Sequence, residues 1–382
     1  MAEPPAVPPR TPARTPAAAR TPEAEPVTVR EYGTRHLRIT VRHHGGTCFS
    51  WLRVPGPAHT RPQRLPPAAV GAALRRVDAA GASGNGGRRG VRLVLGEWAD
   101  AAEDGASVTG AGAGARSGVL YRLPGAVSVA RLLPCGDDTA FRLSVGALAD
   151  LGGTLRRLHR EPWELPERPP HPGVSRLLAW MSGEEEAPGA ARLRALALAR
   201  LGPSLWARLA DWAGAADASS GGAGAVLLHG APSTGWLVPC PLGGRAALLT
   251  GEEVTGGDPA LDLGWVLGEL YELRAAAARG LGAAGQGPPV DHAAAARALL
   301  SGYTGGDGTG AVPPGTGRAA TLRLAVHMRD FASFVGWHED LRPYCDLLAE
   351  TLAENGEPAL RWDTPGVAIE GLTAGEERGR AG

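Results

Sequence analysis

Two short groups of residues in the middle of the chain have the types and spacing that chemistry needs. An apolar stretch that starts at Val226 ends at His229-Gly230, and Gly257-Asp258-Pro259 opens an amphipathic helix that carries Asp262 one turn later. An imidazole can act as a base or fix a loop by hydrogen bonding, and a carboxylate can accept protons, backbone N–H groups or a metal ion. Between the two groups, the pattern predicts a short hairpin and a second apolar strand over 246–249.

This order resembles the core of the aminoglycoside phosphotransferase family, small-molecule kinases that are built like protein kinases. The family pattern is H-G-D-x-x-x-x-N, then a strand that ends in Asp, then G-D-P-x-x-D-L. The framework positions of that pattern match in this chain: His229, Gly230, Gly257, Asp258, Pro259, Asp262 and Leu263. The resemblance implies a bilobal α+β protein-kinase-like fold with a small antiparallel β N-lobe and a mostly helical C-lobe.

The positions that carry the family's chemistry do not match. Ala231 stands where the family has its catalytic Asp, Trp236 where it has a metal-binding Asn, and Thr250 where it has a metal-binding Asp. Phosphoryl transfer needs an Asp to orient the acceptor hydroxyl and Mg²⁺ held by oxygen ligands to neutralise the phosphates. A methyl group, an indole and a neutral hydroxyl supply neither, so we identify no catalytic residue and no metal ligand at these positions.

The composition also excludes the lysine with which protein kinases bind the nucleotide. All 39 basic residues are Arg, and no Lys occurs anywhere, so a nucleotide-binding lysine of the protein-kinase type cannot exist here. Arg, together with abundant Ala, Gly and Pro, is typical of a GC-rich bacterial genome, which accounts for the missing Lys.

Two residues remain as candidates for binding a nucleotide. Arg131 lies on the second arm of a hairpin predicted over 118–134, where related proteins place a basic residue toward the nucleotide, although it fits a solvated strand Arg equally well. If the strand is extended through 248–252, Glu252 shares a face with Thr250 and offers a displaced carboxylate for a metal ion. The competing interpretation of Glu252 and Glu253 is a pair of solvated loop residues.

The matching residues have structural explanations. Asp258 before Pro259 is a helix N-cap followed by Pro at the first helical position, and in the family the residue equivalent to Asp262 braces the catalytic loop by accepting backbone N–H bonds. We expect His229 to pack and hydrogen-bond within its loop rather than to act as a base. His159 ends a strong helix predicted over 144–161 and is expected to cap its carbonyl groups.

Charge and cysteine content exclude several classes of protein. The 39 basic and 39 acidic residues balance, which argues against a partner nucleic acid or an anionic membrane surface. Four Cys, at 48, 135, 240 and 345, are too widely spaced for a zinc site and too few for a disulfide scaffold. No apolar run is long enough to cross a bilayer, and residues 1–26 lack the apolar core of a secretion signal, so we expect a cytoplasmic protein.

The chain divides into four parts by composition. We expect a disordered Pro/Ala/Arg tail over 1–26, an N-lobe over 27–134, a helical C-lobe over 135–363 and a disordered tail over 364–382. Within the N-lobe, a Gly-rich run over 105–118 matches no phosphate-binding loop pattern and is interpreted as a surface loop. In the C-lobe, a helical pattern over 190–213 is interrupted at Gly202-Pro203.

Two functions of different class follow. The first is a catalytically degenerate protein of the family, a pseudokinase, that binds a protein or peptide as a scaffold or substrate-presenting subunit and needs no cofactor. The second is an atypical phosphotransferase that uses ATP and Mg²⁺, with Glu252 and Asp258, on a hydroxyl of a small molecule or of Ser/Thr in a peptide. The resemblance implies bacterial natural-product biosynthesis or resistance as a setting for either function.

Overall fold

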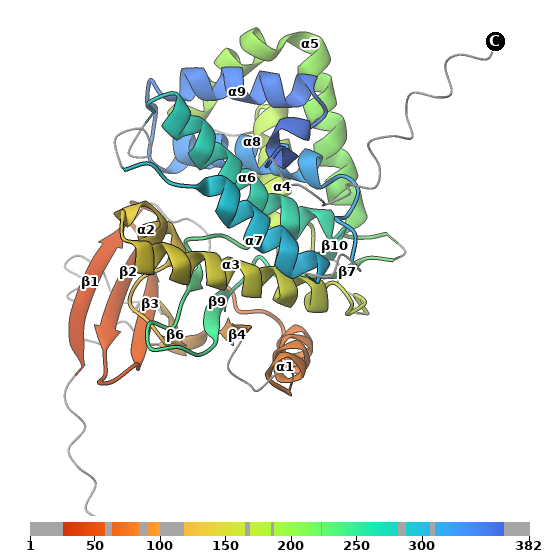
Figure 1. The fold of residues 1–382 in the computed structure, drawn as a ribbon. Coiled ribbons are helices and arrows are strands. Elements are labelled where there is room, and N and C mark those ends of the chain that lie inside the picture. Colours follow the sequence, from red (N-terminus) through yellow and green to blue (C-terminus); the bar gives the residue numbers. More distant parts are fainter. Residues whose placement is uncertain are drawn as a thin grey trace, which may run out of the picture.

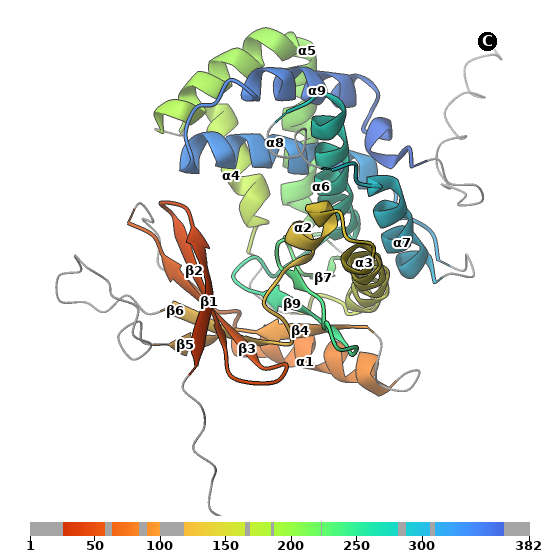
Figure 2. The ribbon, with the colours of Figure 1, turned by 60° about the vertical axis from the view of Figure 1, so that its left-hand side comes forward.

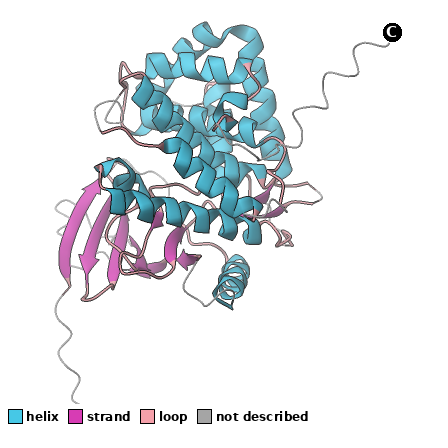
Figure 3. Cartoon of the chain, viewed as in Figure 1, coloured by secondary structure: helices cyan, strands magenta, loops and turns pink. Residues whose placement is uncertain are grey.

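The computed structural model describes residues 26–57, 63–83, 90–99, 118–164, 169–184, 187–222, 224–281, 288–305 and 310–362. Most strands gather at one end of the molecule and most helices at the other, which confirms the predicted bilobal α+β architecture (Figures 1 and 3). The two predicted tails and the Gly-rich run over 105–118 lie almost entirely outside the described residues. Within the described residues, no helix has the length and apolar character needed to cross a membrane.

The N-lobe contains a five-stranded antiparallel sheet in the order β1-β2-β3-β6-β5. Its strands are β1 (Val27–Gly33), β2 (Leu37–His43), β3 (Phe49–Pro55), β5 (Glu97–Ala99) and β6 (Gly118–Leu123). Alternate residues of β2, β3 and β6 point to one side and are buried there, as the two-residue period of a strand requires. Val41, Trp51 and Tyr121 form the centre of this small core and are almost completely buried.

A second, mixed sheet separates the N-lobe core from the C-lobe core, and the sequence did not predict it. Strand β4 (Val91–Leu95) pairs in parallel with β9 (Ala246–Thr250), which pairs antiparallel with β8 (Leu237–Val238). Side chains of β9 alternate between the two cores: Leu248 faces the C-lobe core and Leu249 the N-lobe core. The hairpin expected in the C-lobe is therefore present, but an N-lobe strand extends it.

The segment after β6 does not form the predicted hairpin. It continues into the short helix α2 (Val129–Leu132) and a 3-10 turn, η1 (Leu133–Cys135). Val129 in α2 and Leu133 in η1, four residues apart, are both buried on one side of this helical segment. The expected strand over 126–134 is therefore wrong.

The C-lobe is built from seven helices within the described residues, and the positions of several follow from simple sequence signals. They are α3 (Asp138–Leu158), α4 (Pro172–Ser182), α5 (Pro188–Ser219), α6 (Ala260–Ala278), α7 (His292–Thr304), α8 (Thr316–Phe334) and α9 (Leu341–Ala353). Asp137 caps α3 through a 2.7 Å bond from the Ala140 N–H. Helix α5 is kinked at Gly202, whose φ of 65° is not helical, just before Pro203, as predicted.

Close helix packing holds this lobe together. Helix α3 lies against α7, and α6 lies against α8 (Figures 1 and 2). At the α3–α7 contact, a Cβ atom on Gly302 would lie 1.9 Å from the Ala149 carbonyl oxygen, so only glycine allows this approach. Two further small elements complete the described fold: the strand pair β7 (Val226–Leu228) with β10 (Thr255–Gly257), and the 3-10 helix η2 (Glu357–Leu360).

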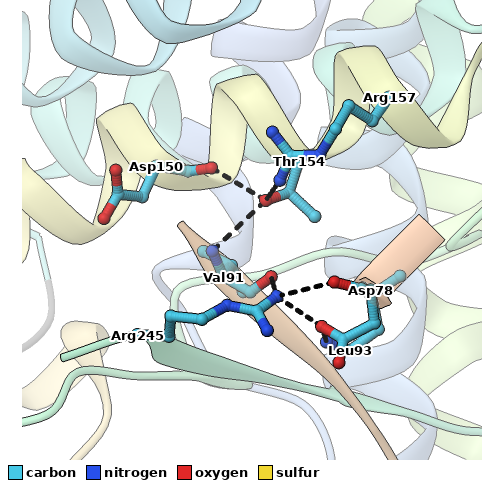
Figure 4. A network of polar contacts seen from close by, with 7 residues as sticks. All are labelled: Asp78, Val91, Leu93, Asp150, Thr154, Arg157 and Arg245. Carbon is cyan, nitrogen blue, oxygen red and sulfur yellow. Dashed lines mark hydrogen bonds and ion pairs between the residues drawn. The ribbon is translucent and has the colours of Figure 1, made fainter. Parts of the chain in front are cut away.

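A polar network joins the mixed sheet to helices of both lobes (Figure 4). Helix α1 (Ala68–Ser83) supplies Asp78, which receives hydrogen bonds from the Arg245 guanidinium and the Leu93 N–H. Arg245, just before β9, also donates to the Val91 carbonyl at 3.0 Å. From the other side, Thr154 on α3 accepts the Val91 N–H at 3.3 Å. Strand β4 is therefore held from the N-lobe helix, the hairpin and the C-lobe at once.

Candidate functional site

The site is built around the loop that follows β7. Gly230 has a φ of 86°, in the left-handed region, and a Cβ atom there would lie 1.8 Å from the Glu253 carbonyl oxygen. Only glycine satisfies both conditions, which explains the His229-Gly230 pair that the sequence presents. The loop consequently lies directly against the turn that follows β9.

Asp262 on α6 holds this loop through hydrogen bonds to its backbone. Its two carboxylate oxygens accept the backbone N–H groups of His229 at 2.7 Å and of Gly230 at 2.8 Å. The side chain is completely buried, which favours the neutral acid, but the hydrogen bond from His159 and the nearby His229 outweigh burial and lower the Asp262 pKa. Asp262 is therefore an ionised, buried anchor of the loop, which is the bracing that the family resemblance implies.

The imidazoles of His229 and His159, near Asp262, are occupied by structural contacts. His229 Nε2 lies 2.8 Å from the Leu249 carbonyl oxygen, to which it donates, while Nδ1 accepts the Ala231 N–H at 3.4 Å. His159 Nε2 lies 3.2 Å from Asp262, and its Nδ1 lies 2.9 Å from the Tyr303 hydroxyl on α7. His159 therefore links three helices through its side chain, and the sequence-based expectation of a carbonyl cap is replaced by this role.

The side chains at the three positions of the family chemistry are buried or half-buried. Thr250, the last residue of β9, is fully buried and donates its hydroxyl to the Val94 carbonyl at 2.8 Å. Ala231 and Trp236 are half-buried and pack against the C-lobe core. The Leu249 N–H donates to the Trp236 carbonyl at 3.1 Å, which places Trp236 beside Thr250. None of the three side chains offers an exposed oxygen ligand.

Arg53 on β3 stacks on one of these residues, Trp236, and no pattern in the sequence singled it out. Its guanidinium carbon lies 4.2 Å from the centre of the Trp236 ring, and Nη1 donates to the Tyr121 hydroxyl at 3.4 Å. The Tyr121 hydroxyl in turn donates to the Thr250 carbonyl at 3.1 Å. The available signal was alternation: Arg53 lies two residues from the buried Trp51 on β3, so both face inward.

Glu253 faces the same group of side chains from the turn after β9. A Cβ atom on Gly251 would lie 2.8 Å from Glu253 Oε2 and 3.6 Å from both Arg53 Nη1 and the Tyr121 hydroxyl, so these groups surround Gly251. Burial raises the pKa of Tyr121, and the Glu253 charge adds to that rise, while Arg53 opposes it. We refer to Arg53, Tyr121, Trp236 and Glu253 as the cleft cluster.

The two candidate nucleotide ligands lie elsewhere than the sequence suggested. Arg131 is exposed on helix α2, with its guanidinium carbon 5.3 Å from the centre of the Tyr32 ring, so its expected place on a strand is wrong. Strand β9 ends at Thr250, and the chain turns at Glu252-Glu253, so the extended geometry that would align Glu252 with Thr250 does not exist. Glu252 is exposed, and Glu253 is the carboxylate that belongs to the cleft cluster.

The start of α6 and the rest of the loop are also held by hydrogen bonds. Asp258 Oδ1 accepts the Ala260 N–H at 2.8 Å, as an N-terminal cap does, although the helix begins at Ala260 rather than Pro259. Gly257 lies in β10 just before it. Farther along the loop, the N–H and hydroxyl groups of Thr234 both donate to the Glu269 carboxylate at 2.8 Å. These contacts fix the loop from His229 to Trp236 on α6.

The arrangement offers a rigid, hydrogen-bonded loop but few groups that could react. Across the described ranges, no cluster of three or more His, Cys, Asp or Glu side chains is placed to hold a metal ion. The Asp258 and Asp262 carboxylates are engaged with backbone N–H groups. The cleft cluster instead combines one cation, one carboxylate and two aromatic rings, which are groups suited to binding.

Comparison with known proteins gives a likeness of fold. No protein family and no curated protein matches the chain. The chain is similar in structure to a glucosamine kinase, with 20% identity over 88% of this chain and 81% of that one at a TM-score of 0.36. It is also similar to the macrolide 2'-phosphotransferase of Brachybacterium faecium, with 19% identity over 84% and 92% of the two chains at a TM-score of 0.37. A type I macrolide 2'-phosphotransferase is 17% identical over 82% of this chain and 88% of its own, at a TM-score of 0.37.

Proposed function

We propose that this chain is a pseudokinase, a protein of phosphotransferase-like fold that acts by binding a protein or peptide partner. The observation that supports this best is the contact between Arg53 and Trp236, 4.2 Å from guanidinium carbon to ring centre, which Tyr121 links to the fully buried Thr250. An indole stacked on a guanidinium and a hydroxyl bonded to the Val94 carbonyl leave both family metal positions without a ligand. We infer a scaffold or substrate-presenting subunit that needs neither ATP nor Mg²⁺.

The direct test is a titration with nucleotide. We expect no Mg²⁺-dependent change in thermal unfolding at about 5 mM ATP, because a ligand stabilises only the state that binds it. A nucleotide whose dissociation constant is 100-fold below its concentration would stabilise the fold by about 2.7 kcal/mol. A Mg²⁺-dependent stabilisation of that size would therefore refute the proposal. ATP without metal and Mg²⁺ without ATP are the controls.

The partner requires its own experiment. Copurification of the tagged chain from its native host is expected to recover a stoichiometric complex that persists in size-exclusion chromatography. The purified partner should then rebind the isolated chain with a measurable dissociation constant in calorimetry. A chain that elutes alone at every concentration would contradict a scaffold or substrate-presenting role.

One observation favours the second candidate, an atypical ATP-dependent phosphotransferase. Arg53 places a permanent positive charge in the cleft, and a guanidinium binds phosphate oxygens through paired hydrogen bonds. In this case Arg53→Gln should abolish nucleotide binding, whereas Arg38→Gln should leave it unchanged. Arg38 lies on the neighbouring strand β2 and pairs with Glu31 at 2.9 Å, which makes it a matched control.

A further inference from the structure

A pocket of about 530 Å³ lies where the turn between β1 and β2 reaches the ends of α5 and α8. The two lobes each contribute part of its wall. Arg35 and His36 come from the N-lobe turn, and Arg192, Ser333, Phe334 and Trp337 come from the C-lobe. Its volume is within the range of pockets that bind small molecules. It does not include any residue of the loop from His229 to Trp236 or of the cleft cluster.

Two arginines make the pocket cationic. Arg35 is exposed and forms no ion pair with any residue that the structure describes. Arg192 is half exposed, with its guanidinium carbon 3.8 Å from the centre of the Trp337 ring, so the ring holds one face of the guanidinium in place. A preorganised guanidinium recognises oxyanions through two parallel hydrogen bonds.

Aromatic rings supply a flat apolar wall beside the arginines. His36 lies 4.4 Å from Phe334 between ring centres, so this contact also joins the N-lobe turn to the C-terminal end of α8. Trp337 is half-buried next to it, and Val335 between them is 59% exposed. A ligand with a flat apolar part would cover this surface and remove it from water.

One polar group of the pocket residues has no partner. The Ser333 hydroxyl oxygen is buried and has no hydrogen-bond partner among the described residues, which is unfavourable unless a ligand or water satisfies it. The first turn of α5, at Pro188-Gly189, has neither a side-chain cap nor an acidic residue. The positive end of the α5 dipole therefore adds to the preference for a negative ligand.

A carboxylate of the chain itself already pairs with one of the two arginines, Arg192. Glu339 is exposed and lies 3.4 Å from Arg192, while it also pairs with Arg342 at 2.6 Å. Hydrogen bonds from Trp337 and Arg342 lower the Glu339 pKa. Because the Glu339–Arg192 pair is exposed and long, a ligand can replace it at little cost.

We propose that this pocket between the lobes binds a small organic anion, with its oxyanion held by Arg35 and Arg192 and its flat apolar part against Phe334 and Trp337. An aromatic carboxylate and an aromatic phosphate ester share this chemistry. The ligand would touch both lobes, so its binding would favour the arrangement in which the β1–β2 turn lies against the C-terminal end of α8. The site is independent of whether the cleft binds nucleotide.

Calorimetric titration of the full chain with phenylacetate and with phenyl phosphate tests the proposal and separates the two ligand classes. We expect at least one probe to bind with a dissociation constant below about 1 mM at low salt and more weakly as salt is added. The neutral isostere phenylacetamide should bind about tenfold more weakly or not at all. The proposal would be overturned if neither anion saturated the protein at about 10 mM, or if phenylacetamide bound as tightly as the anions.

Variants at exposed positions locate the binding. Arg35→Ala and Arg192→Ala should each weaken the better probe by about tenfold or more, whereas Arg38→Ala, with its own partner Glu31, should have no effect. Glu339→Gln removes the competing carboxylate and should strengthen binding about two- to fivefold. These side chains are largely exposed, so the variants are expected to fold, which circular dichroism verifies. Equal losses in the Arg38 variant would show that the anion binds elsewhere.

Discussion

Arg53 lies with its guanidinium carbon 4.2 Å from the centre of the Trp236 ring, so a strand of the N-lobe sheet and the loop after β7 meet through a cation and an aromatic ring. We expect this pair to stabilise the closed cleft by about 0.5–1 kcal/mol beyond the contributions of the separate side chains. A double-mutant cycle with Arg53→Met and Trp236→Leu, measured by urea unfolding, gives this coupling. A coupling of zero would mean that the two side chains only lie near each other.

Asp262 should be the most sensitive polar residue of the site. Asp262→Ala leaves the buried N–H groups of His229 and Gly230 without acceptors, so we expect a loss of about 3–5 kcal/mol in the free energy of unfolding. Asp258→Ala, which removes only a helix cap, should cost about 1 kcal/mol and serves as the control. Urea denaturation compares the two, and an equal loss in both variants would contradict the anchoring role of Asp262.

Restoring the family's metal-binding residue should be unfavourable. Thr250→Asp places a carboxylate in a fully buried position that faces the Val94 carbonyl oxygen, and we expect it to destabilise the fold by about 3 kcal/mol or more. Thr250→Val loses only the neutral hydrogen bond and should cost about 1–2 kcal/mol. If the Thr250→Asp variant folds stably and binds ATP in a Mg²⁺-dependent way in calorimetry, position 250 is accessible to a metal ion and the expectation is wrong.

His171 should make the fold sensitive to acid. Its Nδ1 caps α4 by accepting the Val174 N–H at 3.3 Å, and complete burial lowers its pKa to about 4. Between pH 6.5 and 4 the unfolded chain binds a proton at this residue that the folded chain does not, so stability is lost as the pH falls through this window. The loss from this group is about 3 kcal/mol in total.

His171→Asn isolates this contribution, since Asn keeps a capping oxygen but does not titrate. The free energy of unfolding of this variant, measured at several pH values, should fall less steeply between pH 6.5 and 4 than that of the parent chain. His338→Asn, at an exposed histidine, controls for the loss of a histidine as such. An unchanged acid slope in the His171 variant would place the sensitivity in another group.

The local parts of the fold could be predicted because their signals are local. Leu148, Leu151, Leu155 and Leu158 recur at helical spacing, and in α3 all four are fully buried. The break at Gly202-Pro203 follows from the chemistry of those two residues alone. The residues of the loop and of the α6 start were recognised by type and order, and the structure brings His229, Gly230 and Asp262 into direct contact.

The parts that could not be predicted depend on which distant segments meet. Arg53 and Trp236 come from different lobes, and no local pattern reports their contact. Glu252 was aligned with Thr250 on the assumption of a straight strand, but the chain turns as soon as β9 ends. The four residues of α2 are too few to show a helical period. In addition, the Ala130 N–H donates to the Thr234 carbonyl, which belongs to a loop that is distant in the sequence.

The parallel pairing of β4 with β9 limits the order in which this protein can assemble on the ribosome. Val94 and Thr250 are 156 positions apart in the sequence, yet they are joined by a hydrogen bond. A contact over such a distance closes a long loop, which slows folding, and it cannot form until the second partner has been synthesised. Among the described residues β4 pairs with no strand other than β9, so it waits unpaired while the first half of the C-lobe emerges. A fragment that ends at Pro134 should therefore expose β4 and aggregate.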